Sequence, residues 1–227
     1  SKAKEYRDLH SGATSVFDLK GRGNEYYLNA FGENLGRDDV FLDLSGGRYG
    51  IFKYRLYDNE MRHAVGAGSG ALSPFSGIGG ANLTMPIPTP GANVPVNPNL
   101  SIANWNGFDE SWKRRDTGGM FEISGNSPFY FRAEANQVKR SGVNVFSGAL
   151  GTSPGFGFVN LPAPIDYDTK TYFGEGGYSS KRGHIAVNYT YSNFNNGNDT
   201  LNWSNYNFAG MDTTFLPGTV TFQICGH

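Results

Sequence analysis

Few residues in this 227-residue chain have the types and spacing that catalysis requires. The 4 histidines, His10, His63, His184 and His227, are widely separated and lack the spacing of a metal site. The single cysteine, Cys225, lies near His227, but the second cysteine of a Cys-x-x-Cys-His haem attachment is missing. Because no nucleophile, base or metal set converges, the sequence predicts that the chain is not an enzyme and binds no haem or other cofactor itself.

Two loop segments contain residues that bind small ligands in other proteins. Residues 66–70 are glycine-rich, as in dinucleotide-binding loops, but no strand is predicted before them and no helix after them. Asp38, Asp39 and residues 195–199 offer oxygen ligands of the kind that calcium prefers. Clusters of Asn, Asp and Gly are more often plain turns, so calcium binding at 195–199 stays open.

Full charges alternate with apolar side chains along two strongly patterned segments. Lys53 and Arg55 alternate with apolar residues at 52, 54 and 56, and Arg132 and Glu134 do the same within 129–136. Because side chains of a strand point to opposite faces in turn, each segment forms one apolar and one charged face. The charged side chains either line a hydrated lumen and contact an inserted partner, or face solvent on a one-sided soluble sheet.

The same alternation recurs through most of the chain and predicts the elements that must position these charges. About ten strands are expected: 14–21, 25–34, 40–45, 51–58, 108–115, 120–125, 129–139, 171–179, 184–192 and 219–224. They fall into blocks at 13–59, 105–140, 169–194 and 218–225 of a single β-barrel segment, 1–227, with long loops at 63–104, 141–168 and 195–217. The Asp-Thr-Gly-Gly sequence at 116–119 is expected to form a tight turn between two strands.

Composition leaves two fold classes open. Hydrophobic residues make up 38% and charged residues 17% of a chain that contains 32 Gly, 17 Phe and 13 Tyr, which suits either a transmembrane β-barrel or a secreted β-sandwich. A loop as long as 63–104 is unusual in a compact soluble domain and favours the barrel. No capped helix, no stretch of ~18 apolar residues and no signal segment is visible. The net charge of -1 gives no basic surface for nucleic acid.

Several aromatic residues suit either fold class in different roles. On a barrel they form an interfacial belt, whereas on a soluble protein they bind sugar rings, and the belt is the favoured interpretation. The residues concerned are Trp105, Trp112, Tyr130, Tyr172 and Tyr178.

Specific strings narrow the choice further. They occur in consistent order over most of the chain, at residues 34–39 (NLGRDD), 44–57 (LSGGRYGIFKYRLY), 126–132 (NSPFYFR), 148–155 (GALGTSPG), 161–167 (LPAPIDY) and 212–217 (DTTFLP). These strings resemble the decahaem-associated outer-membrane proteins, the MtrB/PioB family.

The resemblance implies a fold, a location and a partner. It implies a large antiparallel up-and-down transmembrane β-barrel in the bacterial outer membrane, which holds a periplasmic multihaem c-type cytochrome and supports electron transfer across the membrane. An extracellular multihaem cytochrome is a further expected partner. Family barrels have more strands than the ten predicted here, and this chain ends at Cys225-Gly226-His227, so we expect a partial chain. The alternatives are a general outer-membrane porin and a soluble, secreted, carbohydrate-binding β-sandwich.

With this resemblance, the two faces of the predicted strands acquire roles. The residues expected to face the lumen or contact the partner are Asp43, Lys53, Arg55, Arg132, Glu134 and Asn136. The residues expected to face lipid are Leu42, Phe52, Tyr54, Leu56, Phe129, Phe131, Ile185 and Val187.

Overall fold

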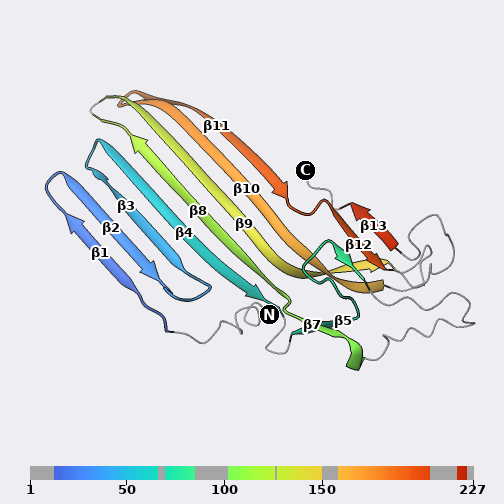
Figure 1. Ribbon diagram of the computed structural model, residues 1–227. Coiled ribbons are helices and arrows are strands. Elements are labelled where there is room, and N and C mark those ends of the chain that lie inside the picture. Colours follow the sequence, from blue (N-terminus) through green and yellow to red (C-terminus); the bar gives the residue numbers. More distant parts are fainter. Residues whose placement is uncertain are drawn as a thin grey trace, which may run out of the picture.

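The chain forms one large antiparallel sheet with two small sheets beside one end of it (Figure 1). The computed structural model describes residues 13–65, 70–84, 102–125, 127–149, 158–204 and 219–223. Their elements are β1 (Phe17–Arg22), β2 (Tyr26–Glu33), β3 (Phe41–Arg48), β4 (Phe52–Ala64), β5 (Ala71–Ser73), β6 (Asn82–Leu83), the 3-10 turn η3 (Ile102–Asn104), β7 (Asn106–Phe108), β8 (Ser111–Ile123), β9 (Phe129–Ala149), β10 (Phe158–Ser180), β11 (Gly183–Asn196), β12 (Thr200–Ser204) and β13 (Thr219–Gln223). The predicted all-β class is confirmed.

The main sheet has eight strands in the order β1-β2-β3-β4-β8-β9-β10-β11. Every neighbouring pair is antiparallel. Strands adjacent in sequence are therefore adjacent in space, except that β5, β6 and β7 are inserted between β4 and β8 (Figure 1). The sheet is open in the described part of the chain, with β1 and β11 at its edges.

The connections of the main sheet differ between its two ends. At one end the strands are joined by short turns at 23–25, 49–51, 124–128 and 181–182, whereas the connection from β4 to β8 at the other end spans 65–110. Glycines with positive φ permit the tight turns, as at Gly50 (φ 71) and Gly125 (φ 53). This alternation of short turns with longer connections is typical of outer-membrane barrel hairpins.

The predicted tight turn at 116–119 is wrong, because β8 runs unbroken from Ser111 to Ile123. Its two glycines leave room for bulky side chains of the adjacent strands. A Cβ at Gly118 would lie 2.8 Å from the Tyr57 hydroxyl, and one at Gly119 would lie 2.8 Å from a Leu56 methyl carbon. The glycines are therefore a packing requirement inside a strand, and the two predicted strands 108–115 and 120–125 are one.

The predicted loop at 141–168 is also wrong over most of its length. β9 continues to Ala149, and β10 begins at Phe158 and pairs with β9 over its whole length. The prolines that indicated a loop, Pro162 and Pro164, lie beyond Tyr167, where pairing with β11 ends. A residue without an N–H is tolerated where a strand has lost one neighbour.

The predicted strand near the C-terminus exists as β13, but it is not part of the main sheet. It pairs with β12, which also pairs with β6, and β5 pairs with β7. The predicted loops 63–104 and 195–217 therefore contain short strands and the end of β4, while residues 66–69, 85–101 and 205–218 lie outside the described residues. Alternation predicts a strand but carries no information about which strand it pairs with.

Most buried hydrophobic residues of the described chain lie where the small sheets meet β10. A cluster of Phe75, Leu83, Leu161, Leu201 and Trp203, each at most 2% exposed, joins β10 to the small sheets. The rest of the main sheet is a single layer. Its apolar side chains have no second layer to pack against in the described part of the chain.

Candidate functional site

The register of the main sheet assigns every predicted residue to one of two faces. Residues directly opposite each other in paired strands share a face, so the assignments pass from strand to strand through pairs such as Asp43 with Tyr57 and Lys53 with Glu122. The polar face, defined by Lys53 and Arg55, contains Asp43, Lys53, Arg55, Arg132, Glu134 and Asn136. The apolar face, defined by Phe52 and Tyr54, contains Leu42, Phe52, Tyr54, Leu56, Phe129, Phe131, Ile185 and Val187.

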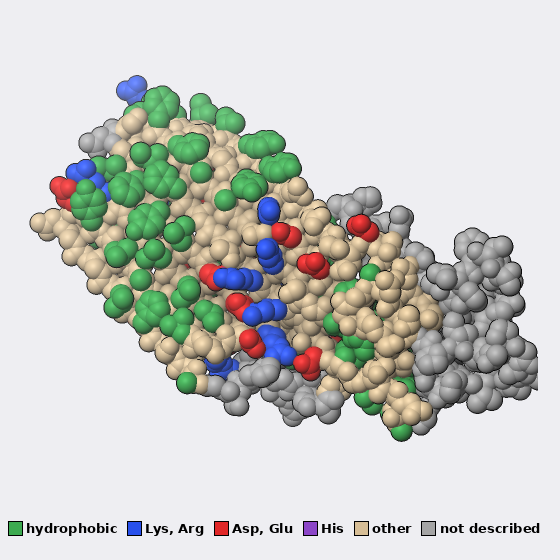
Figure 2. Space-filling view, in the orientation of Figure 1, with side chains coloured by type: hydrophobic (Ala, Val, Ile, Leu, Met, Phe, Trp, Pro, Cys, Tyr) green, Lys and Arg blue, Asp and Glu red, His purple; other side chains and the backbone are tan. Residues whose placement is uncertain are grey.

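The apolar face is exposed to an extent unusual for a water-soluble protein. Val187 is 74% exposed, Ile185 70% and Phe129 65%. Figure 2 shows such side chains gathered over one end of the main sheet, in a patch that ends at a row of charged residues. A contiguous apolar surface of this kind marks contact with lipid or with a protein.

The polar face carries a series of cross-strand ion pairs. The Arg55 Nε lies 2.5 Å from the Asp43 Oδ2, and the Lys53 Nζ lies 3.0 Å from a Glu122 carboxylate oxygen. Lys53 and Glu122 lie directly opposite each other, whereas Arg55 and Asp43 are diagonal neighbours. A directly opposite pair of unlike charges stabilises the strand pairing modestly, by about 0.2–1 kcal/mol. Since charges of both signs are paired along it, the face is strongly hydrophilic without one dominant sign.

Aromatic side chains join this series of polar contacts. The Tyr57 hydroxyl donates to the Asp116 Oδ1 at 3.1 Å, and the Tyr130 hydroxyl donates to the Glu175 Oε1 at 2.8 Å. Arg132 pairs with Glu134, its neighbour on the same face. The guanidinium carbon of Arg132 also lies 6.0 Å from the ring centroid of Phe173, within the range of a cation–π contact.

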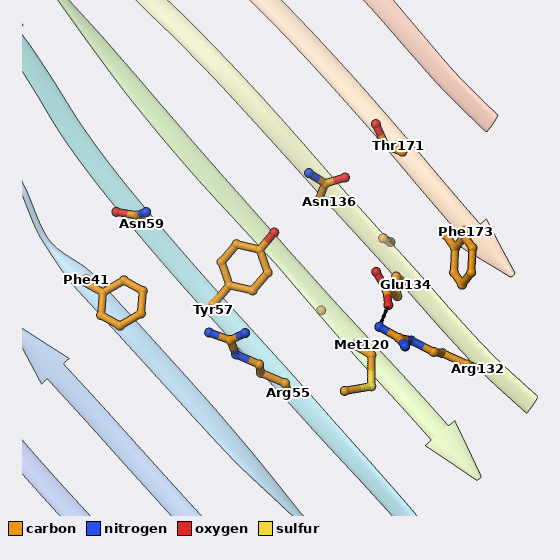
Figure 3. A pocket seen from close by; sticks show the side chains of 12 residues that line it. Phe41, Arg55, Tyr57, Asn59, Met120, Arg132, Glu134, Asn136, Thr171 and Phe173 are labelled. Carbon is orange, nitrogen blue, oxygen red and sulfur yellow. Dashed lines mark ion pairs between the residues drawn. The ribbon is translucent and has the colours of Figure 1, made fainter. Parts of the chain in front are cut away.

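An open groove of ≈ 460 Å³ lies along this face (Figure 3). Its labelled lining residues come from β3, β4, β8, β9 and β10: Phe41, Arg55, Tyr57, Asn59, Met120, Arg132, Glu134, Asn136, Thr171 and Phe173. Three of the six predicted lumen residues, Arg132, Glu134 and Asn136, follow one another on the same face of β9, and Arg55 of β4 lines the groove on the other side of β8. The groove offers donors, acceptors and both signs of charge, but no group arranged for bond-making.

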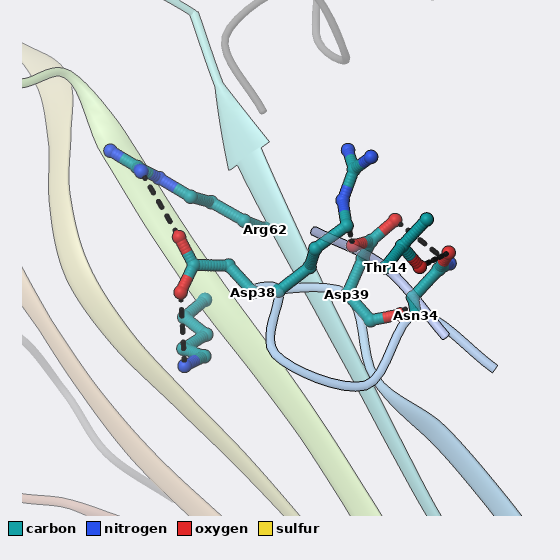
Figure 4. Close-up of polar contacts among 7 residues, drawn as sticks. Thr14, Asn34, Asp38, Asp39 and Arg62 are labelled. Atoms are coloured by element: carbon teal, nitrogen blue, oxygen red, sulfur yellow. Dashed lines mark hydrogen bonds and ion pairs between the residues drawn. The ribbon is translucent and has the colours of Figure 1, made fainter. Parts of the chain in front are cut away.

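A second polar cluster ties the loop between β2 and β3 to the main sheet (Figure 4). The Arg62 Nη1 lies 3.4 Å from the Asp38 Oδ2, and the Lys113 Nζ lies 3.9 Å from the Asp38 Oδ1. Within the loop, the Asn34 Nδ2 donates to the Asp39 Oδ2 at 3.1 Å. Asp38 and Asp39, considered as calcium ligands in the sequence, have these basic and amide partners in the structure.

The other ligand-binding candidates within the described residues do not line the groove. At 195–199 the Asn198 N–H donates to the Asn196 Oδ1 at 3.1 Å, an Asx turn that already uses one candidate calcium ligand. The described residues contain no group of three His, Cys, Asp or Glu side chains placed to hold a metal ion. His63 stacks on Trp112 with ring centroids 3.9 Å apart. The segment 66–69, His10, Cys225 and His227 lie outside the described residues. No helix in the described ranges is long and apolar enough to cross a membrane.

The five aromatic residues predicted to form a belt do not share one surface. Tyr172 and Tyr178 lie on the apolar face, 49% and 39% exposed. Trp112 and Tyr130 lie on the polar face, and Trp105 lies outside the strands. The prediction of one continuous belt is therefore wrong. It did not consider that successive residues of a strand point to opposite faces of the sheet.

Four residues of the polar face were missed by the sequence reasoning. Tyr57, Glu122, Phe173 and Glu175 make the contacts described above, and Tyr57 and Phe173 line the groove. Glu122 and Glu175 occupy alternating positions of predicted strands, so the two-residue period could have identified them.

A one-layer antiparallel sheet with an exposed apolar face and an ion-paired polar face is the wall of a transmembrane β-barrel. Residues 1–219 match the family model described as "Putative outer membrane beta-barrel porin, MtrB/PioB", and the chain belongs to this family of outer-membrane proteins. It is 29% identical over 207 residues to Outer membrane protein MtrB of Shewanella baltica (strain OS185). The alignment covers 88% of this chain and 27% of the relative, so the chain spans about a quarter of that protein's length. The predicted family, fold class and outer-membrane location are confirmed.

Proposed function

We propose that this chain forms a sector of an outer-membrane sheath that holds a multihaem c-type cytochrome, through which electrons cross the membrane. Membership of the MtrB/PioB family is the observation that carries this proposal, and the similarity to Outer membrane protein MtrB supports it. A periplasmic cytochrome would be the inserted partner, and an extracellular multihaem cytochrome a second one. The chain itself supplies position and insulation, and the partner supplies the haem.

The proposal assigns the apolar face to lipid and the polar face to the lumen. Val187 is 74% exposed in the described part of the chain, where a contiguous apolar surface would be unfavourable in water. In a lipid environment the same side chain is favourable, whereas Arg55 and Arg132 on the opposite face would be costly there. The sheet is therefore favourable in only one orientation, with its apolar face toward lipid and its polar face toward the lumen.

The groove on the polar face suits contact with a folded, polar protein. Arg55, Glu134 and Asn136 present donors and acceptors to the lumen, and Phe41 and Phe173 add apolar contact area beside them. Locally paired charges of both signs allow a hydrated contact with many orientations of a partner's surface. We propose that this groove lies against the inserted cytochrome.

Co-purification tests the sheath function directly. The whole outer-membrane protein would be produced with a periplasmic multihaem c-type cytochrome, extracted in detergent and captured by a tag on the barrel. Haem absorbance should follow the barrel through size-exclusion chromatography. Vesicles that contain the captured complex should transfer electrons from external dithionite to an enclosed acceptor dye.

Variants of the groove give the test its specificity. Arg132→Glu places a fourth carboxylate beside Glu122, Glu134 and Glu175 and should lower cytochrome retention. Lys181→Glu, at an exposed turn, should not. A folded barrel that never retains a cytochrome would refute the proposal.

The family description also includes the word porin, which supports a second candidate function. A hydrated polar face with balanced charges suits an open aqueous channel of low ion selectivity. Planar bilayers separate the two functions. A general porin conducts ions without a partner, whereas a sheath conducts much less once the cytochrome occupies its lumen.

A further inference from the structure

The row of charges that ends the apolar patch includes two cations on facing positions of neighbouring strands. In the register of β8 with β9, Arg115 lies directly opposite Lys139, on the apolar face. Facing positions in antiparallel strands place Cβ atoms about 4.5–5.5 Å apart, and like charges there are destabilising. Lys170 of β10 is the diagonal neighbour of Lys139, since Lys139 faces Asp168. Three cations therefore surround one patch of the wall.

Acidic side chains of β4 neutralise Arg115, which binds Asp58 and faces Glu60, whereas Lys139 forms no ion pair with Asp168, the residue it faces, among the contacts of the described residues. Arg115 binds Asp58 in a bidentate pair, with N–O distances of 2.9 and 2.8 Å. Asp168 accepts from the Gln137 amide through both oxygens at 2.8 Å, and its contact with the Lys170 Nζ is long, at 4.0 Å. Among the contacts of the described residues, no side-chain ion pair or hydrogen bond involves Lys139.

The position of the patch along the strands indicates what meets it. On β10 the apolar face changes from Tyr172 to Lys170 within one two-residue step, and on β9 from Ala135 through Gln137 to Lys139. In the lipid-facing assignment, this step is the boundary between the acyl chains and the headgroups. Figure 2 shows the charged row crossing the strands at the edge of the apolar patch.

The thickness of the apolar patch brings these cations to headgroup level. On β9 it runs from Phe129 to Ala135, about 20 Å along the strand at ~3.3 Å per residue. A strand tilt of ~40° reduces this to about 15 Å across the membrane, less than the ~25 Å apolar band typical of such barrels. Lys139 and Lys170 therefore reach the headgroup layer rather than the water beyond it.

We propose that Arg115, Lys139 and Lys170 form a binding site for the phosphate group of a membrane lipid. The lipid would belong to the outer leaflet, because the short turns lie at the opposite end of the strands and such turns are periplasmic in outer-membrane barrels. The two Lys ammonium groups, together with the Arg115 N–H groups that do not bind Asp58, can donate to phosphate oxygens. The phosphate would also give Lys139 an ion-pair partner. The inference rests on the lipid-facing assignment of this surface but not on any cytochrome.

Lipid retention by the whole protein in detergent tests the site. Native mass spectrometry would compare lipid A that carries two phosphates with its dephosphorylated form. The wild type should prefer the phosphorylated lipid, and Lys139→Gln with Lys170→Gln should weaken its binding about 30-fold, at ~1 kcal/mol per basic residue near the membrane surface. Lys20→Gln with Lys181→Gln removes the same charge elsewhere and should leave binding unchanged.

Two further arms complete the test. Lys139→Arg with Lys170→Arg keeps the charge and should retain the lipid, which covers the case in which the glutamine variant fails to fold. An equal loss in the Lys20 and Lys181 control, or no loss in the glutamine variant, would overturn the proposal. Complete displacement by inorganic phosphate at matched ionic strength would also overturn it, since it would indicate a site for the free ion. Quenching of Val187→Trp fluorescence by brominated lipid separately tests the assignment of this surface to lipid.

Discussion

A charge placed at the centre of the apolar face should be far more costly than the same charge one residue away. Val187 lies inside the apolar stretch of β11 that runs from Ile185 to Tyr191 on one face. It faces Gly176, where an added Cβ would meet nothing within 4 Å. An arginine at position 187 therefore has room, so that its cost comes from contact with hydrocarbon rather than from a steric clash.

The expected cost of Val187→Arg is about 2–4 kcal/mol, the range for Arg near the midplane on the lipid face of a barrel. This corresponds to about a 30- to 1,000-fold decrease in the folding equilibrium constant. Asn188→Arg is the matched control. It places the same side chain on the polar face, opposite Glu175, where a cross-strand ion pair should make it neutral or stabilising by about 0.2–1 kcal/mol.

Urea titration of the whole protein in lipid vesicles, followed by the heat-modifiable mobility of the folded barrel, measures both variants. If Asn188→Arg destabilises the barrel as much as Val187→Arg does, the assignment of the two faces is wrong. If both variants are neutral, neither face of β11 contacts lipid.

Three further predictions concern packing and partner contact. Gly118→Val should prevent β4 from pairing normally with β8, because its Cβ would lie 2.8 Å from the Tyr57 hydroxyl. The control Gly174→Val should fold, since no atom lies within 4 Å of a Cβ at that position. The yield of heat-modifiable barrel compares the two variants. Trp203→Ala should lower the stability of the buried cluster beside β10 by about 3–5 kcal/mol. Amide hydrogen exchange should become faster in β12 and stay unchanged in β4. Equal acceleration in both strands would contradict a cluster that unfolds separately from the main sheet. Arg132→Glu should reduce retained haem absorbance at unchanged barrel yield, and equal retention would exclude Arg132 from the contact with the cytochrome.

The sequence predicted the faces of the strands better than their ends. A two-residue period decides which side chains share a face, and this placed Lys53 with Arg55 and Phe52 with Tyr54 as the register has them. Strand ends depend on partners that the local sequence does not contain. Gly118 and Gly119 are residue types that favour turns, but here they lie within a strand, where the lack of a side chain leaves room for Tyr57 and Leu56 of the neighbouring strand.

The pairing of distant segments could not be predicted either, because local sequence does not show which strands become partners. β13 alternates as a barrel strand would, yet its partner is β12. The groove is likewise assembled from five strands, and its Phe173 became a candidate only when register placed it opposite Glu134. Single-strand patterns can suggest such residues, but cross-strand register is needed to bring them together.

β10 extends beyond the distance over which the surface charge of the membrane acts. β10 has 23 residues, and the part from Tyr172 to Phe158 continues about 46 Å along the strand past the apolar patch, at ~3.3 Å per residue. Even after tilt, this distance is several times the Debye length of ~8 Å at physiological salt. A protein that docks at the far end would meet bulk electrolyte, so its association rate should be insensitive to the surface charge of the lipids. Ligands near Lys139 would experience that surface potential in full.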